Sequence, residues 1–316
     1  MSTDQPAQNL PRREGFISFP TPLVSTPPSI WYEIFGLWPP AEESRPGLTL
    51  HGGPGYTHDY LLSFADLCHS PANLTVIFFD QLGSGRSTHF REKLHDEAFW
   101  TEQFFLDQVT AVVNYLRIGQ AYDVIGHSWG GMLGAAHAAR QPQGLKHLVI
   151  AHAPPASKFW LQKYKEFRET MPEPHHQILL ETRTIESSLE PRYLEAIGAV
   201  NRRFFMTCDP LPEGLVASYE DMGKDRTATL SCLGPDEFEW TGFMASWSII
   251  DNIVDIKCKT LVLVGTNQGV DHDEAMALWR TRLLDHSFVK FPRSKHFSHW
   301  EERSKCMEVI SEFLNS

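Results

Sequence analysis

Short apolar runs alternate with longer amphipathic segments along much of the chain, which is the pattern of an α/β protein. The apolar runs have the composition of buried strands and cover residues 47–50, 74–80, 122–127, 145–151, 260–265 and 287–291. Residues 97–117 and 300–314 place apolar side chains at helical spacing, and the Ala-rich segment 132–140 also has a helical composition. We therefore predict a mostly parallel, doubly wound sheet.

The N-terminal region departs from this pattern. Residues 1–14 are polar, and we expect them to be disordered. Two apolar pieces, 16–19 and 30–35, are separated by prolines, which are tolerated at sheet edges and excluded from central ladders. These pieces therefore predict antiparallel edge strands.

A second departure lies in the middle of the chain. Between residues 154 and 243 the strand patterns disappear, and charged, aromatic stretches broken by prolines take their place. A helical segment inserted after a core strand explains this change. We predict a core formed by residues 15–153 and 244–316, with a helical cap at 154–243.

Composition excludes several classes of function. The chain has 316 residues, is 42% hydrophobic and carries a net charge of −11 without a basic run, so nucleic acid is a poor partner. Its five cysteines are scattered singly, which argues against a disulfide framework. No apolar stretch has the length of a signal peptide or a membrane span. We expect a soluble, cytoplasmic protein without membrane contacts; the sequence does not indicate an oligomeric state.

The sequence around Ser128 indicates a nucleophile. The predicted strand 122–127 runs into Gly126-His127-Ser128-Trp129-Gly130 and then directly into the predicted helix. A serine in this strand, turn and helix context is exposed at a strained bend above the sheet, with the positive end of the helix beneath it. We therefore predict that Ser128 is a catalytic nucleophile.

A Gly-rich loop follows the predicted strand 47–50. Backbone N–H groups can approach a developing oxyanion there without interference from side chains. The N–H of Gly53 and that of Trp129, the residue after the nucleophile, are the predicted oxyanion-hole donors. The glycines in 81–87 complete no nucleotide-binding motif, and no His-Glu-x-x-His spacing indicates zinc. We expect neither a cofactor nor a metal.

Three motifs in this order resemble those of the proline iminopeptidases and their tricorn-associated aminopeptidase relatives: HGGPG at 51–55, DQLGSGRS at 80–87 and GHSWGG at 126–131. Residues 234–238 resemble the lid motif of the same family, and 296–300 resemble its catalytic-histidine loop. The resemblance implies an α/β-hydrolase fold with Ser128 as nucleophile, His296 as general base and Glu237 as an anchor for the free amine of the substrate. His296 also follows the last predicted strand, where a triad histidine belongs by chain order; His299 is its rival.

The sequence departs from the family where the triad acid is expected. Family members have Gly-x-x-Asp-Glu after the strand at 260–265, and this chain has Gly265-Thr266-Asn267-Gln268-Gly269. An amide, Gln268, therefore occupies the acid position, and the second amine-anchoring carboxylate is missing. Asp271 is a candidate substitute acid, as is Asp273, although capping of a following helix also explains an aspartate here.

These residues support three hypotheses. The first is a serine hydrolase acting on a small amide, peptide or ester substrate in a lidded pocket. The second is a repurposed biosynthetic enzyme of the same fold that catalyses elimination, epimerisation or cyclisation, in which His296 moves a proton and Ser128 donates a hydrogen bond. The third is a ligand-binding protein without catalysis. All three take a small molecule or a short peptide into the cavity.

Overall fold

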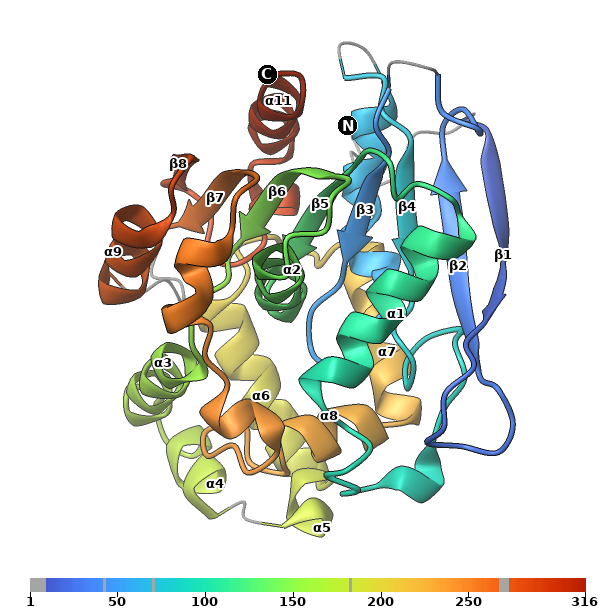
Figure 1. The fold of residues 1–316 in the computed structure, drawn as a ribbon. Helices are drawn as coiled ribbons and strands as arrows, with labels where there is room; N and C mark the ends of the chain where they lie inside the picture. The colour runs from blue at the N-terminus through green and yellow to red at the C-terminus, as the bar shows by residue number, and fades with distance from the viewer. Residues whose placement is uncertain (1–9, 42–43, 70–71, 182–183, 267–272) are drawn as a thin grey trace.

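The computed structural model describes residues 10–41, 44–69, 72–181, 184–266 and 273–316. Within these residues one sheet has the strand order β1-β2-β4-β3-β5-β6-β7-β8 (Figure 1). Strand β2 pairs antiparallel with β1 and β4, and the remaining neighbours are parallel. The strands are β1 (Arg12–Ser18), β2 (Ser29–Phe35), β3 (Gly47–Leu50), β4 (Val76–Phe79), β5 (Tyr122–His127), β6 (Leu145–Ala151), β7 (Lys259–Gly265) and β8 (His286–Phe291). The predicted mostly parallel sheet is confirmed.

The first edge strand begins earlier than the sequence predicts. The disorder expected for residues 1–14 is wrong for Arg12 to Glu14, because these residues pair with β2. Arg12 Nε also donates to the carboxylate of Glu33 at 2.7 Å, and this pair fixes the start of the strand. Residues 1–9 lie outside the described residues.

Helices cover both faces of the sheet. Helices α1 (Glu102–Tyr115) and α2 (Trp129–Ala139) pack together on the face toward the viewer in Figure 1, while α11 (Arg303–Leu314) packs against the 3₁₀ helix η1 (His58–Cys68) on the other face. Helix α1 begins later than predicted because the Thr101 side chain caps it by accepting a hydrogen bond from the N–H of Phe104. No helix of the described residues is both long and apolar enough to cross a bilayer.

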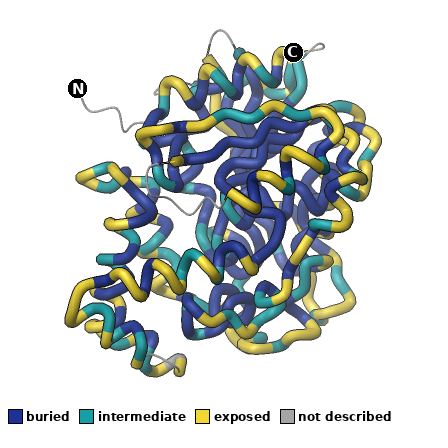
Figure 2. Tube along the Cα trace, turned by 90° about the vertical axis from the view of Figure 1, so that its left-hand side faces the viewer, coloured by how far each residue is buried: buried dark blue, intermediate teal, exposed yellow. Residues whose placement is uncertain are grey.

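Helices replace strands between β6 and β7, in the segment for which the sequence predicts a helical cap. These inserted helices gather at the lower end of the sheet in Figure 1, and their outer surface carries many of the exposed residues in Figure 2. They are α3 (Ser157–Glu169), α4 (His175–Glu181), α5 (Ile185–Ser188), α6 (Pro191–Phe204), α7 (Glu213–Lys224) and α8 (Thr227–Cys232). Helix α7 is tied to the core, because the N–H of Thr57 donates to Ser218 Oγ at 3.0 Å.

Three backbone segments meet where β5 turns into α2. A Cβ atom on Gly130 would lie 1.9 Å from the carbonyl oxygen of Leu50, at the end of β3. A Cβ atom on Gly126 would lie 2.2 Å from the carbonyl oxygen of Gly130. Because these neighbours are backbone atoms of the central sheet and its helix, they cannot move aside as a flexible side chain does. The turn therefore depends on glycine at both positions.

Substituting Gly130 tests this close contact. We expect Gly130→Ala to lower the free energy of unfolding by about 3 kcal/mol or more, because the added methyl group would clash with backbone atoms that cannot move aside. Gly223→Ala is the matched control, since a Cβ atom added to this exposed helical glycine would meet no described heavy atom within 4 Å beyond its chain neighbours and its own helix backbone, and alanine favours the helix. Urea unfolding followed by circular dichroism measures both variants; equal stabilities would contradict the contact.

Candidate active site

Ser128 lies at the bend between β5 and α2. Its backbone has φ 56° and ψ −125°, a conformation that costs a residue with a side chain about 1–3 kcal/mol. The bend is held by the N–H of Ser128, which donates to the carbonyl of Ala151 on β6 at 2.9 Å. The serine is half-buried although His127 and Trp129 on either side are buried. The strained turn therefore turns the hydroxyl-bearing side chain out of the core.

One cavity brings together the predicted site residues that the structure describes. Its wall includes Ser128, Gly53, Trp129, Glu237 and His296, which come from four separate regions of the chain. Gln268 and Asp271 lie outside the described residues. Asp273, the other candidate for the acid position, is the first residue of α9 (Asp273–Arg282) and does not line the cavity.

The main chain of His296 is fixed on both sides. Its N–H donates to the carbonyl of Phe205, just after α6, at 3.0 Å. Its carbonyl accepts a hydrogen bond from His127 Nε2 at 2.8 Å. The first contact ties the histidine loop to the inserted helices, and the second ties it to the nucleophile turn.

Glu301 adds a further clamp on this loop. Its Oε2 atom accepts from the N–H of Lys295 at 3.0 Å and from that of Phe297 at 2.8 Å, the residues before and after His296. Its Oε1 atom accepts from the N–H of Thr207 at 2.7 Å. A single carboxylate thus sets the loop conformation and joins it to the segment after α6.

The imidazole of His296 sits in an apolar and aromatic enclosure. Its ring centroid lies 5.1 Å from that of Trp160 and 5.5 Å from that of Phe205, both in edge-on contact. Burial, followed by the nearby rings of His127, His152 and His299, lowers the pKa of His296 well below its usual value. The ring is therefore neutral near pH 7, which is the state that accepts a proton. Within the described part of the chain, its Nδ1 atom has no hydrogen-bond partner.

His299, the rival base, does not line the cavity. It is fully buried, its ring centroid lies 5.0 Å from that of Phe64, and neither ring nitrogen has a partner among the described residues. Of these two histidines, the structure therefore places His296 on the cavity wall.

Backbone N–H groups of two loops border the cavity near Ser128. Gly53 has φ +113°, a conformation that favours glycine, and Trp129 begins α2. Neither N–H donates to an acceptor in the described ranges, so both are available to a ligand. Gln81 joins the two loops, because its Oε1 accepts from Trp129 Nε1 at 3.0 Å and its Nε2 donates to the carbonyl of His51 at 2.9 Å.

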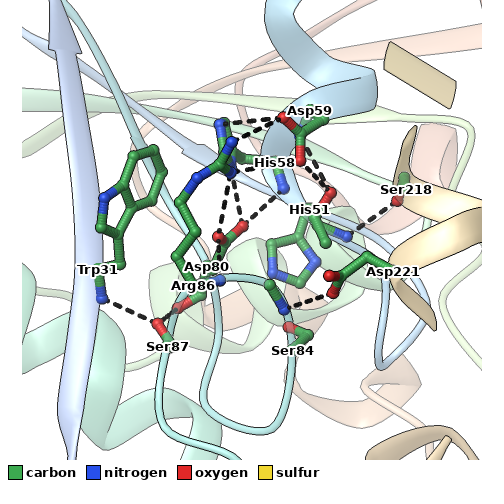
Figure 3. A network of polar contacts seen from close by, with 12 residues as sticks. Trp31, His51, His58, Asp59, Asp80, Ser84, Arg86, Ser87, Ser218 and Asp221 are labelled. Carbon is green, nitrogen blue, oxygen red and sulfur yellow. Dashed lines mark hydrogen bonds and ion pairs between the residues drawn. The ribbon is translucent and has the colours of Figure 1, made fainter. Parts of the chain in front are cut away.

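The Gly-rich loop 80–87 anchors η1 through Asp80. Asp80 Oδ1 accepts from the N–H of His58 at 2.9 Å and lies 2.8 Å from His58 Nδ1, while Oδ2 accepts from the N–H of Arg86. Figure 3 shows His58, Asp59 and Arg86 gathered around this carboxylate. Burial alone would raise the pKa of Asp80, but His58 and these donors together lower it. The carboxylate is therefore ionised and holds the start of η1 in place.

Glu237 is an acidic residue of the cavity wall. It is surrounded by the phenol groups of Tyr56, Tyr164 and Tyr219, all of which line the same wall. Burial raises the pKa of Glu237, while Arg226 opposes this shift. A carboxylate in an aromatic enclosure is suited to a cation, because the cation restores the interactions that the carboxylate loses on leaving water.

Sequence reasoning missed several residues around the site. Tyr56 and Thr229 line the cavity, and the hydroxyl of Tyr60 lies 3.0 Å from Nδ1 of His127, the residue before Ser128. His127 is hydrogen-bonded at both of its ring nitrogens. The position of Tyr56 directly after the HGGPG motif is a usable signal, whereas Thr229 gives none because its approach depends on the inserted helices.

Comparisons with known proteins agree with this geometry. The family model described as "alpha/beta hydrolase fold" matches residues 48–303. The proline iminopeptidases of Saccharolobus solfataricus and Thermoplasma volcanium are each 28% identical to this chain; the matches cover 91% and 84% of this chain and 89% and 88% of those proteins.

Solved structures give the same result. The crystal structure of VinJ has a TM-score of 0.87 and 34% identity, and that of the proline iminopeptidase of Mycobacterium smegmatis has 0.82 and 30%. Each match covers 96% of this chain and 98% of the other. The chain therefore belongs to the α/β-hydrolase fold family and is proline iminopeptidase-like in both sequence and structure.

Proposed function

We propose that this protein is a serine hydrolase that cleaves a small amide, peptide or ester substrate carrying a free amine, in a cavity that the inserted helices close as a lid. The observation that carries the proposal is the common cavity of Ser128, His296, the N–H groups of Gly53 and Trp129, and Glu237. A nucleophile, a base, oxyanion donors and an anion for the amine are thereby available to one ligand. Similarity to proline iminopeptidases supports the same class of substrate.

The reaction follows from these positions. Ser128 Oγ attacks the carbonyl carbon while its proton passes to the neutral imidazole of His296. The N–H groups of Gly53 and Trp129 donate to the developing oxyanion. The imidazolium then protonates the leaving amine or alcohol, and a water molecule, deprotonated by the same imidazole, releases the acyl group from Ser128.

The unpartnered Nδ1 atom of His296 favours a second candidate. No described residue hydrogen-bonds this atom, and the sequence places an amide, Gln268, at the acid position. In the serine-protease example, an amide in place of the acid lowers turnover by about 10⁴-fold because the imidazolium loses its stabilising carboxylate. A repurposed enzyme that moves a proton without hydrolysis is therefore the alternative, and a non-catalytic binding protein is a third.

Removing the nucleophile separates these candidates. We expect the wild type to hydrolyse aminoacyl esters faster than aminoacyl naphthylamides, because a good leaving group needs less help from the imidazolium. Ser128→Ala is expected to lower the rate by about 10³-fold or more. Ser311→Ala, a buried serine on α11 remote from the cavity, is the control and is expected to keep full activity. Equal activity of wild type and Ser128→Ala would contradict a serine nucleophile.

Glu237 is tested by an isosteric change. We expect Glu237→Gln to lower kcat/KM for a proline ester with a free amine by about 10- to 100-fold, because a charge-assisted hydrogen bond is worth about 1.5–3 kcal/mol. The N-acetylated ester lacks the charge and is expected to react equally with both proteins. Glu239→Gln, on the same segment but outside the cavity wall, is the control. A similar loss with both substrates would argue against amine recognition.

The pH dependence distinguishes the two titrating groups. His296 accepts a proton only when it is neutral, and its lowered pKa keeps it neutral below pH 6.5, so activity on an N-acetylated ester is expected to persist there. Glu237 binds an amine only when it is ionised, and its pKa is raised above 4.5. Activity on free-amine substrates is therefore expected to fall as the pH is lowered, and this fall begins at a pH above 4.5. Profiles of kcat/KM against pH measure both effects. An acid limb above pH 6.5 for the N-acetylated ester would contradict the neutral buried base.

A further inference from the structure

We propose that Tyr60 is a positioning residue that aligns the oxyanion loop, the nucleophile turn and the histidine loop through one directed chain of hydrogen bonds. This inference rests on the proposed function, because it concerns how the same reacting groups are held. Tyr60 lies on η1, is fully buried and does not line the cavity, so it has no contact with a substrate.

The chain of contacts has three links. The N–H of Gly52 donates to Tyr60 Oη at 2.6 Å. Tyr60 Oη lies 3.0 Å from His127 Nδ1, and His127 Nε2 lies 2.8 Å from the carbonyl oxygen of His296. These three contacts connect Gly52, which precedes Gly53, and His127, which precedes Ser128, to the backbone of His296.

The direction of each hydrogen bond is determined by its partners. A carbonyl oxygen only accepts, so His127 Nε2 carries a proton and donates to His296. Burial lowers the pKa of His127 to about 3, so the ring is neutral and its Nδ1 atom accepts. The hydroxyl of Tyr60 must therefore donate to Nδ1, and its oxygen is free to accept from the N–H of Gly52. For the neutral ring, no other arrangement of protons satisfies all three contacts.

Close packing prevents these groups from moving independently. A Cβ atom on Gly52 would lie 2.8 Å from Tyr60 Oη and 3.1 Å from the Cβ of Ser128. The loop at Gly52 is therefore wedged between the tyrosine hydroxyl and the nucleophile. A small shift of the hydroxyl changes where the neighbouring Gly53 N–H points relative to Ser128.

Tyr60 is itself held rigidly. Trp300 Nε1 donates to its carbonyl at 2.7 Å, and Asp80 fixes the start of η1 two residues earlier through His58 (Figure 3). Its ring makes edge-on contacts with Tyr56 and Phe297, each at 5.9 Å between centroids. The hydroxyl is therefore held in a fixed position, and through its hydrogen bonds it can align the other three segments.

The test compares two buried Tyr–His pairs. Tyr60→Phe removes the hydroxyl and keeps the ring, and Tyr122→Phe does the same to a remote pair in which Tyr122 Oη lies 2.7 Å from His137 Nε2. The readout is the covalent labelling of Ser128 by a fluorophosphonate, resolved into the maximal rate kinact and the half-saturating concentration KI. Thermal unfolding of both variants verifies that they are folded.

We expect Tyr60→Phe to lower kinact by about 10- to 100-fold with KI changed less than about threefold, because misplacement of reacting groups slows the step and leaves binding intact. Tyr122→Phe is expected to match the wild type. His127→Gln breaks the same chain at its second link and is expected to lower kinact similarly, which keeps the test decisive if Tyr60→Phe does not fold.

Two results would overturn the inference, and they differ from each other. Equal kinact for Tyr60→Phe and Tyr122→Phe, with wild-type Ser128 labelled, would refute the positioning role alone. Absence of any adduct on wild-type Ser128 would refute the proposed nucleophile, and the positioning role with it.

Discussion

The contact of Gly130 with the carbonyl of Leu50 is the constraint on which the site depends. Because a Cβ atom at residue 130 would lie 1.9 Å from that oxygen, the end of β3 and the start of α2 touch through their backbones alone. This contact places the loop after β3, with Gly53, beside the first turn of α2, with Trp129. The positions of Gly53 and Trp129 relative to Ser128 therefore follow from the packing of the central sheet.

The inserted helices and the segment after α6 enclose the side chain of His296. Trp160 and Phe205 cover the ring of His296, and the carbonyl of Phe205 binds its backbone N–H. Phe205 therefore both covers the imidazole and holds the backbone of its loop. Burial and the surrounding histidine rings keep this imidazole neutral. The same cavity is also lined by Glu237, a carboxylate among tyrosines whose surroundings suit a cation.

Local patterns explain why much of the fold, and several residues that share the candidate cavity, were predictable. The strands at the centre of the sheet are short apolar runs, and Ser128, Gly53 and His296 are recognisable from motifs that follow predicted strands in order. Features that depend on distant partners were not predictable. Strand β1 extends to Arg12 because Glu33 binds it, and Tyr60 acquires its role from Gly52 and His127, which no spacing in the sequence relates to it.

The catalytic role of Ser128 can be tested with a crystal structure of the protein after reaction with a small aminoalkyl phosphonate ester. We predict a bond from phosphorus to Ser128 Oγ, a phosphoryl oxygen within hydrogen-bond distance of the N–H groups of Gly53 and Trp129, and the amine beside Glu237. A phosphonate bound in the cavity without a bond to Ser128, or attached to another residue, would contradict it.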